Sequence, residues 1–260
     1  MIASVLIKAC DQILYLRDTF PALANQTLQD FEVLLLYSGR SSETPQLAEQ
    51  YGARILTIPA DPFSHPKSLN LGAKEARGEY LVCLSADAVP ANQHWLEELV
   101  VPLISCATVA GSYGRHTLRR GANVIDLVRI GSRYRWSPAC KMDGEGHVFF
   151  SNANSAIRKE LWQAHRFDEH LPGCEDYEWA LWAQREGHAI AYAPKAAVRH
   201  THGERYGYRR YKERISEFRG LCARIDAGAR AREPRPSDRE APPPCVKRKQ
   251  SAPCLWLSAS

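Results

Sequence analysis

The sequence predicts an α/β protein whose first half is a mostly parallel β-sheet flanked by helices. Short apolar runs alternate with helical patterns, and strands are expected at residues 4–7, 31–36, 54–58 and 80–84. These runs are apolar throughout, as in strands that are buried on both faces. Strands and helices that alternate at this spacing indicate parallel strands joined by right-handed crossovers.

Helical periodicity fills the intervals between these strands. Apolar residues recur every three or four positions from Ile13 to Leu23, residues 43–51 follow a Ser-Ser pair that can cap a helix, and residues 69–76 end just before Gly78. Ligands of parallel sheets bind beyond the carboxyl ends of the strands. We therefore expect a site in the loops that follow the four predicted strands.

The second half of the chain is less regular. Loops are expected at 111–120 and 137–147, short strands at 148–150, 155–157, 189–192 and 197–200, and a helix at 176–187. This interleaving favours an elaboration of the first half over an independent domain. The predicted organisation is a body at 1–202, divided into halves at 1–105 and 106–202, then a basic helical extension at 203–229 and a disordered tail at 230–260.

Composition and charge exclude several protein classes. The 260 residues are 45% hydrophobic and 24% charged, which excludes a fibrous or fully disordered chain. Residues 203–260 hold 14 of the 34 Lys and Arg residues but only 7 of the 29 acidic ones, so the body carries 20 bases and 22 acids. A nucleic-acid-binding core is not indicated. The basic end of the chain is a candidate for contact with an anionic membrane, and a solvated tail is the alternative.

The sequence favours a cytoplasmic location. It contains no secretory signal pattern and no apolar run of membrane-spanning length. The eight cysteines are scattered without a C-x-x-C pair, so a zinc cluster is not expected.

The strand at residues 80–84 is followed closely by a carboxylate, Asp87, at the edge where ligands bind. A single aspartate there can hold a divalent cation that also contacts a diphosphate. The structural alternative is an aspartate that shapes the turn before Pro90.

Two further groups could carry chemistry. Glu175 and Asp176 open the helix whose inner face carries Trp179, and a carboxylate there can act as a general base. The alternative is stabilisation by the helix dipole alone. His200 and His202 follow an apolar strand and share one face, so an imidazole could complete a metal site begun by Asp87, and two solvated histidines are the alternative.

Taken in order, these features resemble a known family. The chain resembles the family 2 glycosyltransferases of the GT-A fold, and among them the bacterial rhamnosyltransferase-type enzymes. The resemblance extends from Ser4 to His202 and rests on segments 4–11, 26–33, 70–73, 78–81, 85–91, 149–157, 167–169, 175–180 and 198–202.

The resemblance implies an enzyme that moves a sugar, with inversion, from a nucleotide-diphosphate donor to a hydroxyl of a glycan or lipid-linked acceptor. It also implies that the half at 1–105 binds the nucleotide sugar and that the half at 106–202 is the acceptor and catalytic half. Asp87 matches the second aspartate of the D-x-D motif, which holds Mn²⁺ or Mg²⁺, and His202 or His200 matches the histidine that closes the metal site. Asp176, with Glu175 beside it, matches the catalytic base. The residues implied on the donor side are Ala9, Asp11, Ser38, Lys67, Asn70, Ser85 and Asp87, and those implied in the sugar pocket are Ser151, Asn152, Asn154 and Trp179.

Three positions depart from the family's pattern. Tyr37 stands where an aspartate usually contacts the nucleobase, Ser85 replaces the first aspartate of D-x-D, and Leu69 replaces an arginine for which Lys67 could substitute. These departures put base recognition in doubt and leave a non-catalytic nucleotide-sugar or glycan-binding relative as the alternative. A sugar-phosphate nucleotidyltransferase is less well supported, because the loop after residue 7 lacks a glycine-rich segment. A glycoside hydrolase is disfavoured by the parallel-sheet pattern.

Overall fold

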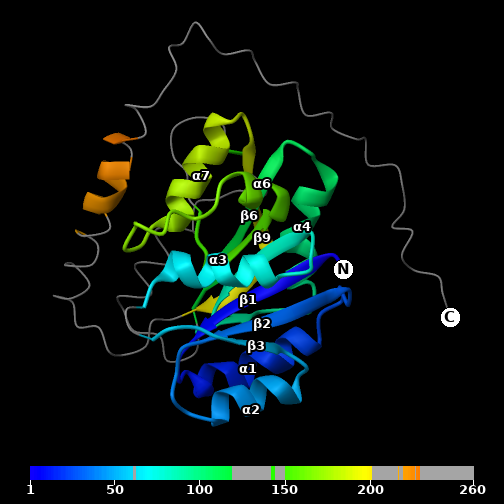
Figure 1. Ribbon diagram of the computed structural model, residues 1–260. Coiled ribbons are helices and arrows are strands. Elements are labelled where there is room, and N and C mark those ends of the chain that lie inside the picture. The colour runs from blue at the N-terminus through cyan, green and yellow to red at the C-terminus, as the bar shows by residue number, and fades with distance from the viewer. Residues whose placement is uncertain are drawn as a thin grey trace, which may run out of the picture.

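The computed structural model describes residues 1–60, 63–118, 142–143, 150–200, 216, 219–225 and 227–228. They form the predicted α/β architecture (Figure 1). The strands are β1 (Ala3–Ala9), β2 (Phe31–Tyr37), β3 (Arg54–Thr57), β4 (Tyr80–Ser85), β5 (Ala88–Pro90), β6 (Val109–Thr117), β7 (Met142–Asp143), β8 (Asn154–Arg158) and β9 (Ala189–His200). The helices are α1 (Ile13–Ala24), α2 (Glu43–Gln50), α3 (His65–Glu75), α4 (Trp95–Ser105), α6 (Lys159–Ala164) and α7 (Glu175–Arg185).

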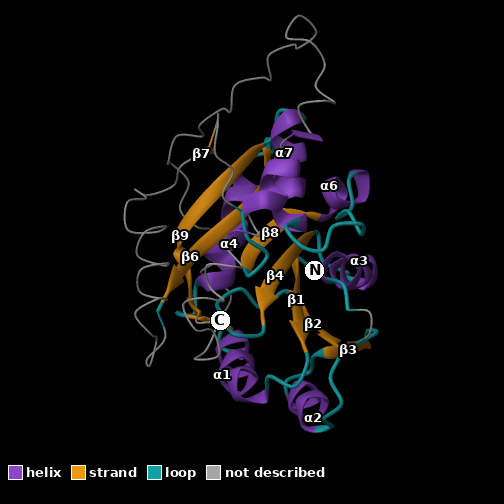
Figure 2. Ribbon diagram, turned by 90° about the vertical axis from the view of Figure 1, so that its left-hand side faces the viewer, coloured by secondary structure: helices purple, strands orange, loops and turns teal. Residues whose placement is uncertain are grey.

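The described strands form one sheet in the order β3-β2-β1-β4-β8-β6-β9-β5, with β7 beside β9 (Figure 2). Strands β1 to β4 are parallel, as predicted, and β8 runs antiparallel to β4. Strand β6 is antiparallel to β8 and parallel to β9. The carboxyl ends of β1, β4, β6 and β9 therefore meet at one edge of the sheet, which we call the carboxyl edge.

Helices cover both faces of the sheet, and strand alternation explains how. Val5 and Ile7 of β1 point to one face and Leu6 to the other, because successive side chains of a strand alternate. The first face packs on α1, α2 and α4, which contribute Leu16, Phe20, Ala48, Trp95 and Leu99. The second face packs on α3, α6 and α7, which contribute Leu69, Ala73, Trp162, Trp179 and Ala183.

The structure corrects the prediction for the second half in three respects. Residues 111–117, expected in a loop, belong to strand β6, which is paired on both sides and buried over most of its length. The two strands expected at 189–192 and 197–200 are one strand, β9, with an irregular register opposite Gly114 and His116. Strand β5 and helix α6 were not predicted. The predicted loop at 137–147, the strand at 148–150 and the tail at 230–260 lie largely or wholly outside the described residues.

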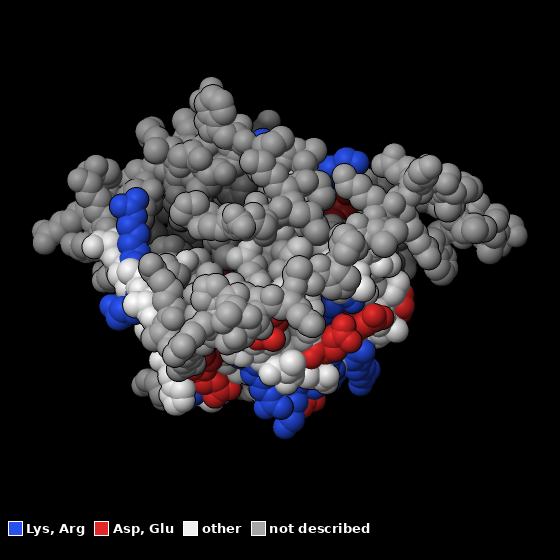
Figure 3. Space-filling model, turned by 90° about the horizontal axis from the view of Figure 1, so that it is seen from above, with Lys and Arg blue, Asp and Glu red and all other residues white. Residues whose placement is uncertain are grey.

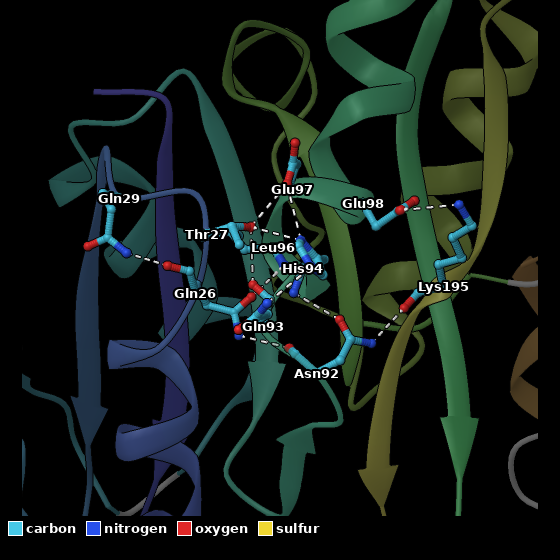
Figure 4. A network of polar contacts seen from close by, with 10 residues as sticks. All are labelled: Gln26, Thr27, Gln29, Asn92, Gln93, His94, Leu96, Glu97, Glu98 and Lys195. Atoms are coloured by element: carbon cyan, nitrogen blue, oxygen red, sulfur yellow. Dashed lines mark hydrogen bonds and ion pairs between the residues drawn. The ribbon is translucent and has the colours of Figure 1, made fainter. Parts of the chain in front are cut away.

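A polar network ties the loop after α1 to the start of α4 (Figure 4). Gln26 is 2% exposed, and its Nε2 donates to the carbonyl oxygens of Ala22 at 2.8 Å and Asn92 at 3.0 Å. Its Oε1 accepts from the N–H of Leu96 at 2.9 Å, in the first turn of α4. The side chain of Asn92 continues the network to the carbonyl oxygen of Lys195 in β9. The buried amide therefore has partners for both of its polar atoms, as burial of a polar group requires.

Charged side chains of both signs alternate along the described part of the face seen in Figure 3. Among the described residues, Arg54 pairs with Glu32 at 2.6 Å and Lys195 with Glu98 at 3.5 Å. Among the described residues, no helix is both long enough and apolar enough to cross a membrane.

Candidate active site

The carboxyl edge gathers most of the residues that the sequence singles out. Lys8 near the end of β1 pairs in register with Ser85 at the end of β4, and Asn154 at the start of β8 lies opposite Leu84. The N–H of Ser85 donates to the carbonyl oxygen of Ala153 at 3.2 Å, which joins the loop after β4 to the turn before β8. Residues far apart in the chain thus meet where parallel sheets place their ligands.

Asp87 is held by groups from two elements of this edge. The hydroxyl of Ser85 donates to its Oδ1 at 2.5 Å, and Nε2 of His200 lies 3.2 Å from the same oxygen. His200 reaches this position because it pairs with Ala88 across β5 and β9. Ser85, which replaces the first aspartate of the family's motif, therefore orients the second. The side chain of Asp87 is 22% exposed, so it remains accessible to a ligand.

The chemistry of this pair suits a divalent cation. Two ligands in neighbouring positions around an ion that binds at about 2.1 Å lie about 3 Å apart. Oδ1 of Asp87 and Nε2 of His200, 3.2 Å apart, fit that spacing. Within the part of the chain that the structure describes, no three His, Cys, Asp or Glu side chains form a metal-binding group. His202, the other predicted ligand, lies outside the described residues.

A histidine that the sequence analysis missed contacts this pair. Nδ1 of His116, in β6, lies 3.0 Å from Nδ1 of His200, and the two rings meet edge to face. Both imidazoles are buried, with 7% and 3% of their surface exposed. Segment 111–120 was expected to be a loop, so alternation along a strand could not be applied to His116. The sequence signal for His116 was a histidine in a segment that leads to the carboxyl edge.

Asp176 lies in the first turn of α7, where two backbone N–H groups hold its carboxylate. Oδ2 accepts from Asn152 at 3.0 Å and Oδ1 from Tyr177 at 2.8 Å. Cys174 precedes the helix in the left-handed conformation, with φ 61°, and turns the chain into it. Desolvation, followed by the adjacent carboxylate of Glu175, raises the pKa of Asp176 to about 6.

Glu175 is more deeply buried than Asp176 and has different partners. Its side chain is 7% exposed, and Oε1 lies 3.8 Å from Nζ of Lys8 and 3.4 Å from Nδ2 of Asn152. Lys8 in turn contacts Nδ1 of His65 at 3.0 Å. Glu175 is therefore the buried partner of the partly exposed Lys8, whereas Asp176 is itself partly exposed. Although the two carboxylates are adjacent in sequence, that of Asp176 is the more accessible to a ligand.

Comparison with known proteins identifies the family. The profile of "Glycosyl transferase family 2" matches residues 4–165. The chain belongs to glycosyl transferase family 2. The resemblance found in the sequence is thereby confirmed.

Relatives in this family are named for the transfer of rhamnose. The O-antigen chain rhamnosyltransferase WbaN of Salmonella anatum is 29% identical over 202 residues, which cover 74% of this chain and 64% of the relative. The O-antigen chain rhamnosyltransferase RfbN of Salmonella typhimurium is 27% identical over 190 residues, which cover 70% and 60%. The chain spans less than two thirds of the length of these relatives.

Solved structures confirm the predicted GT-A fold. The mannosyltransferase PcManGT of Pyrobaculum calidifontis, in complex with GDP-Man and Mn²⁺, is similar with a TM-score of 0.64 at 18% identity, over 92% of this chain and 65% of that one. Residues 1–349 of Staphylococcus aureus TarS, in complex with UDP, are similar with a TM-score of 0.63 at 17% identity, over 77% and 60%.

The loops after β1 and β2 are joined at the position where this family 2 protein departs from the family's pattern. The hydroxyl of Tyr37 donates to Oδ1 of Asp11 at 2.7 Å and also contacts the carbonyl oxygen of Ser41. This hydrogen bond is the main reason why the pKa of Asp11 is lowered, while burial raises the pKa of Tyr37 to about 12. The N–H of Ser38 donates to the carbonyl oxygen of Ala9 at 2.9 Å. Tyr37 thus shapes the predicted nucleoside loop from within.

Asn70 and Asn154 make contacts inside the fold of this family 2 protein. Nδ2 of Asn70 donates to Glu169 and to the carbonyl oxygen of Phe167, and its Oδ1 accepts from Trp162 and from the N–H of Phe167. Asn154, with none of its surface exposed, has partners of the same kind for both ends of its amide. These amides hold the framework behind the site.

The other predicted residues fall into two groups. Trp179 has none of its surface exposed and belongs to the core under α7. Ser151 lies in the turn before β8, where its carbonyl oxygen accepts from the N–H of Asn154 at 3.0 Å. Lys67 is exposed in the first turn of α3. The predicted roles of these residues toward a ligand stay predictions.

Proposed function

We propose that this family 2 protein is an inverting glycosyltransferase that moves a hexose or deoxyhexose from a nucleotide-diphosphate donor to an acceptor hydroxyl. The observation that carries the proposal is the juxtaposition, at the carboxyl edge, of the Asp87–His200 pair, whose spacing suits a cation, and a carboxylate with a raised pKa. Asp176 accepts from the N–H of Asn152, and the next residue, Ala153, accepts from Ser85, two residues before Asp87. The two carboxylates therefore flank one short stretch of backbone.

On the donor side, Asp87 and His200 would hold Mn²⁺ or Mg²⁺ against the diphosphate. A divalent cation bound there supplies positive charge that stabilises the negative charge of the leaving nucleotide. The loop that joins Ala9 and Asp11 to Ser38 would hold the nucleoside, and exposed Lys67 would face the phosphates. Names of similar proteins that include GDP-Man, UDP and Mn²⁺ support this assignment as a class.

On the acceptor side, Asp176 would accept the proton of the attacking hydroxyl. A carboxylate with a pKa of about 6 is ionised at neutral pH and is a stronger base than an ordinary aspartate. The N–H groups of Asn152 and Tyr177 fix its orientation. Because the base lies across the sugar from the leaving group in an inverting transfer, one displacement suffices.

The experiment that tests this proposal replaces Asp176 with asparagine and separates binding from turnover. We expect Asp176→Asn to bind nucleotide with an unchanged Kd in calorimetry and to lose transfer by about 10²-fold to 10⁴-fold, the usual contribution of a general base. Asp18→Asn, at an exposed position of α1, is the matched control. Unchanged turnover in Asp176→Asn would remove it as the base.

The same assays test the alternative of a non-catalytic binding relative, which Tyr37 motivates because its hydroxyl occupies an oxygen of Asp11. A screen of UDP, GDP, dTDP and CDP sugars with and without Mn²⁺ would detect binding as increased thermal stability. Binding without hydrolysis or transfer in the presence of any acceptor would favour the alternative.

We also propose that the acceptor is a growing surface polysaccharide or a lipid-linked glycan, and that the protein works at the cytoplasmic side of the membrane. The names of the O-antigen relatives and the excess of bases in residues 203–260 support this proposal. Binding to anionic liposomes that weakens as salt rises is the expected result. Binding that is absent or insensitive to salt would contradict it.

A further inference from the structure

We propose that His116 is the positioning residue of the Asp87–His200 cation site. The inference rests on the cation-binding part of the proposed function and adds a residue that the sequence motifs do not include. Nδ1 of His116 lies 3.0 Å from Nδ1 of His200, and Nε2 of His200 lies 3.2 Å from Oδ1 of Asp87. The three side chains form a chain of contacts from β6 through β9 to the loop after β4.

The chemistry of imidazole determines which nitrogen donates and which accepts in these contacts. A neutral imidazole carries one N–H and one lone pair, so the hydrogen bond made by one nitrogen selects the state of the other. When Nδ1 of His200 donates to Nδ1 of His116, Nε2 of His200 presents its lone pair toward Asp87. That arrangement suits two groups that share a cation, because histidine ligands usually donate their second N–H to a fixed acceptor.

The reverse arrangement serves the same site when it holds no cation. If Nδ1 of His116 donates, Nε2 of His200 carries the proton and lies 3.2 Å from Oδ1 of Asp87. In passing from the first arrangement to the second, the shared proton moves from Nδ1 of His200 to Nδ1 of His116, while Nε2 of His200 takes a proton from solvent and Nε2 of His116 releases one, so both imidazoles stay neutral. In each state Nδ1 of His116 is the group that fixes the ring of His200.

The backbone explains why the two rings meet. His116 pairs with Val198 across the parallel strands β6 and β9, and His200 lies two residues further on the same face of the sheet. Strand β6 approaches β9 closely just before this point, because a Cβ at Gly114 would collide with the carbonyl oxygen of Ala196. The register shifts between Gly114 and His116. The irregular stretch thus sets His116 beside His200.

The burial of His116 and His200 favours a polar role for His116 over one of filling volume. His116 and His200 are 7% and 3% exposed, and the removal of two imidazoles from water is costly unless their polar atoms are used. An apolar side chain could fill the volume at position 116 but could not direct the lone pair of His200. The inference therefore predicts a loss of cation affinity that depends on where the substituted side chain carries its polar group.

The test measures Mn²⁺ binding to the full chain without donor, by calorimetry and by electron paramagnetic resonance. His116→Asn keeps an amide where Nδ1 lies and should bind Mn²⁺ within about threefold of the parent. His116→Leu and His116→Gln, which lack a polar group at that point, should bind about 10-fold to 100-fold more weakly, as is usual when a partner of a metal ligand is lost. His94→Leu, at an exposed position before α4, is the matched control.

A second readout follows the histidine ring directly. In long-range ¹H–¹⁵N spectra of the parent, the tautomer of His200 should change when Mg²⁺ is added, and His116→Leu should abolish that change while His116→Asn retains it.

The outcomes distinguish a failure of this inference from a failure of the proposed function. If the parent binds no Mn²⁺, the cation-binding part of the proposed function fails and the inference fails with it. If the parent binds and His116→Leu binds equally well, only the role of His116 is overturned. If His116→Leu does not fold, equal affinities of the Asn and Gln variants overturn the inference, and a selective loss in the Gln variant supports it.

Discussion

Replacement of Lys8 with methionine tests its ion pair with buried Glu175, beside the proposed base. Nζ of Lys8 lies 3.8 Å from Oε1 of Glu175, and the two side chains are 16% and 7% exposed. At an effective dielectric constant of about 20, charges at this separation attract by about 4 kcal/mol. Methionine preserves most of the aliphatic stem but leaves the Glu175 carboxylate buried without its cation. Because an uncompensated buried charge is costly, we expect Lys8→Met to lower the free energy of unfolding by about 3–5 kcal/mol.

A double-mutant cycle measured by urea unfolding at pH 7 isolates the pair. Lys8→Met, Glu175→Gln and the double variant should show a coupling free energy of about 1–3 kcal/mol, with the double variant more stable than the sum of the single losses predicts. Lys67→Met, at an exposed position in α3, is the matched control and should change stability by less than about 0.5 kcal/mol. Additive losses within about 0.3 kcal/mol would refute the ion pair as a source of stability.

The remaining predictions concern pH and the β6–β9 contact. Because the pKa of Asp176 is raised to about 6, we expect transfer to increase with pH through about 6, and Glu175→Gln to move this limb to lower pH; a limb that stays in place would contradict the effect of Glu175. The raised pKa also means that the folded chain favours the protonated form of Asp176. This preference contributes fully to the free energy of unfolding below about pH 4, and the contribution is lost as pH increases through about 6. Urea titrations across this range would measure the loss. Finally, Gly114→Ala should cost about 1–3 kcal/mol or more, because its Cβ would collide with the carbonyl oxygen of Ala196; Gly173→Ala, whose Cβ would meet nothing within 4 Å, is the control, and equal losses would contradict the close approach.

The parallel half of the fold was predictable because its signals are local. Strands β1, β2, β3 and β4 are continuous apolar runs, and the helices between them repeat their apolar residues at helical spacing. Residues 111–117 escaped prediction for the opposite reason. Their glycines and polar residues favour a loop, and only pairing with β8 and β9 makes them a strand.

Individual residues of the site divide in the same way. Asp87 and Asp176 could be proposed from the sequence because each stands at the boundary of a strand or helix, where polar groups often face ligands. Asn70 and Asn154 lie in segments with the same resemblance, yet their amides bind the protein itself. Sequence patterns locate polar residues near an edge but do not reveal which way a side chain turns.

The order of residues along the chain determined the α/β class and the family, and it pointed to the two carboxylates on which the proposed chemistry rests. What required the folded chain is the pairing of distant groups: Lys8 with Glu175, Ser85 with Asp87, and His116 with His200. The physical reason is the distance along the chain over which each signal acts. Periodicity and turn chemistry act over a few neighbouring residues, whereas these contacts join positions that only the sheet brings within a few ångströms of each other.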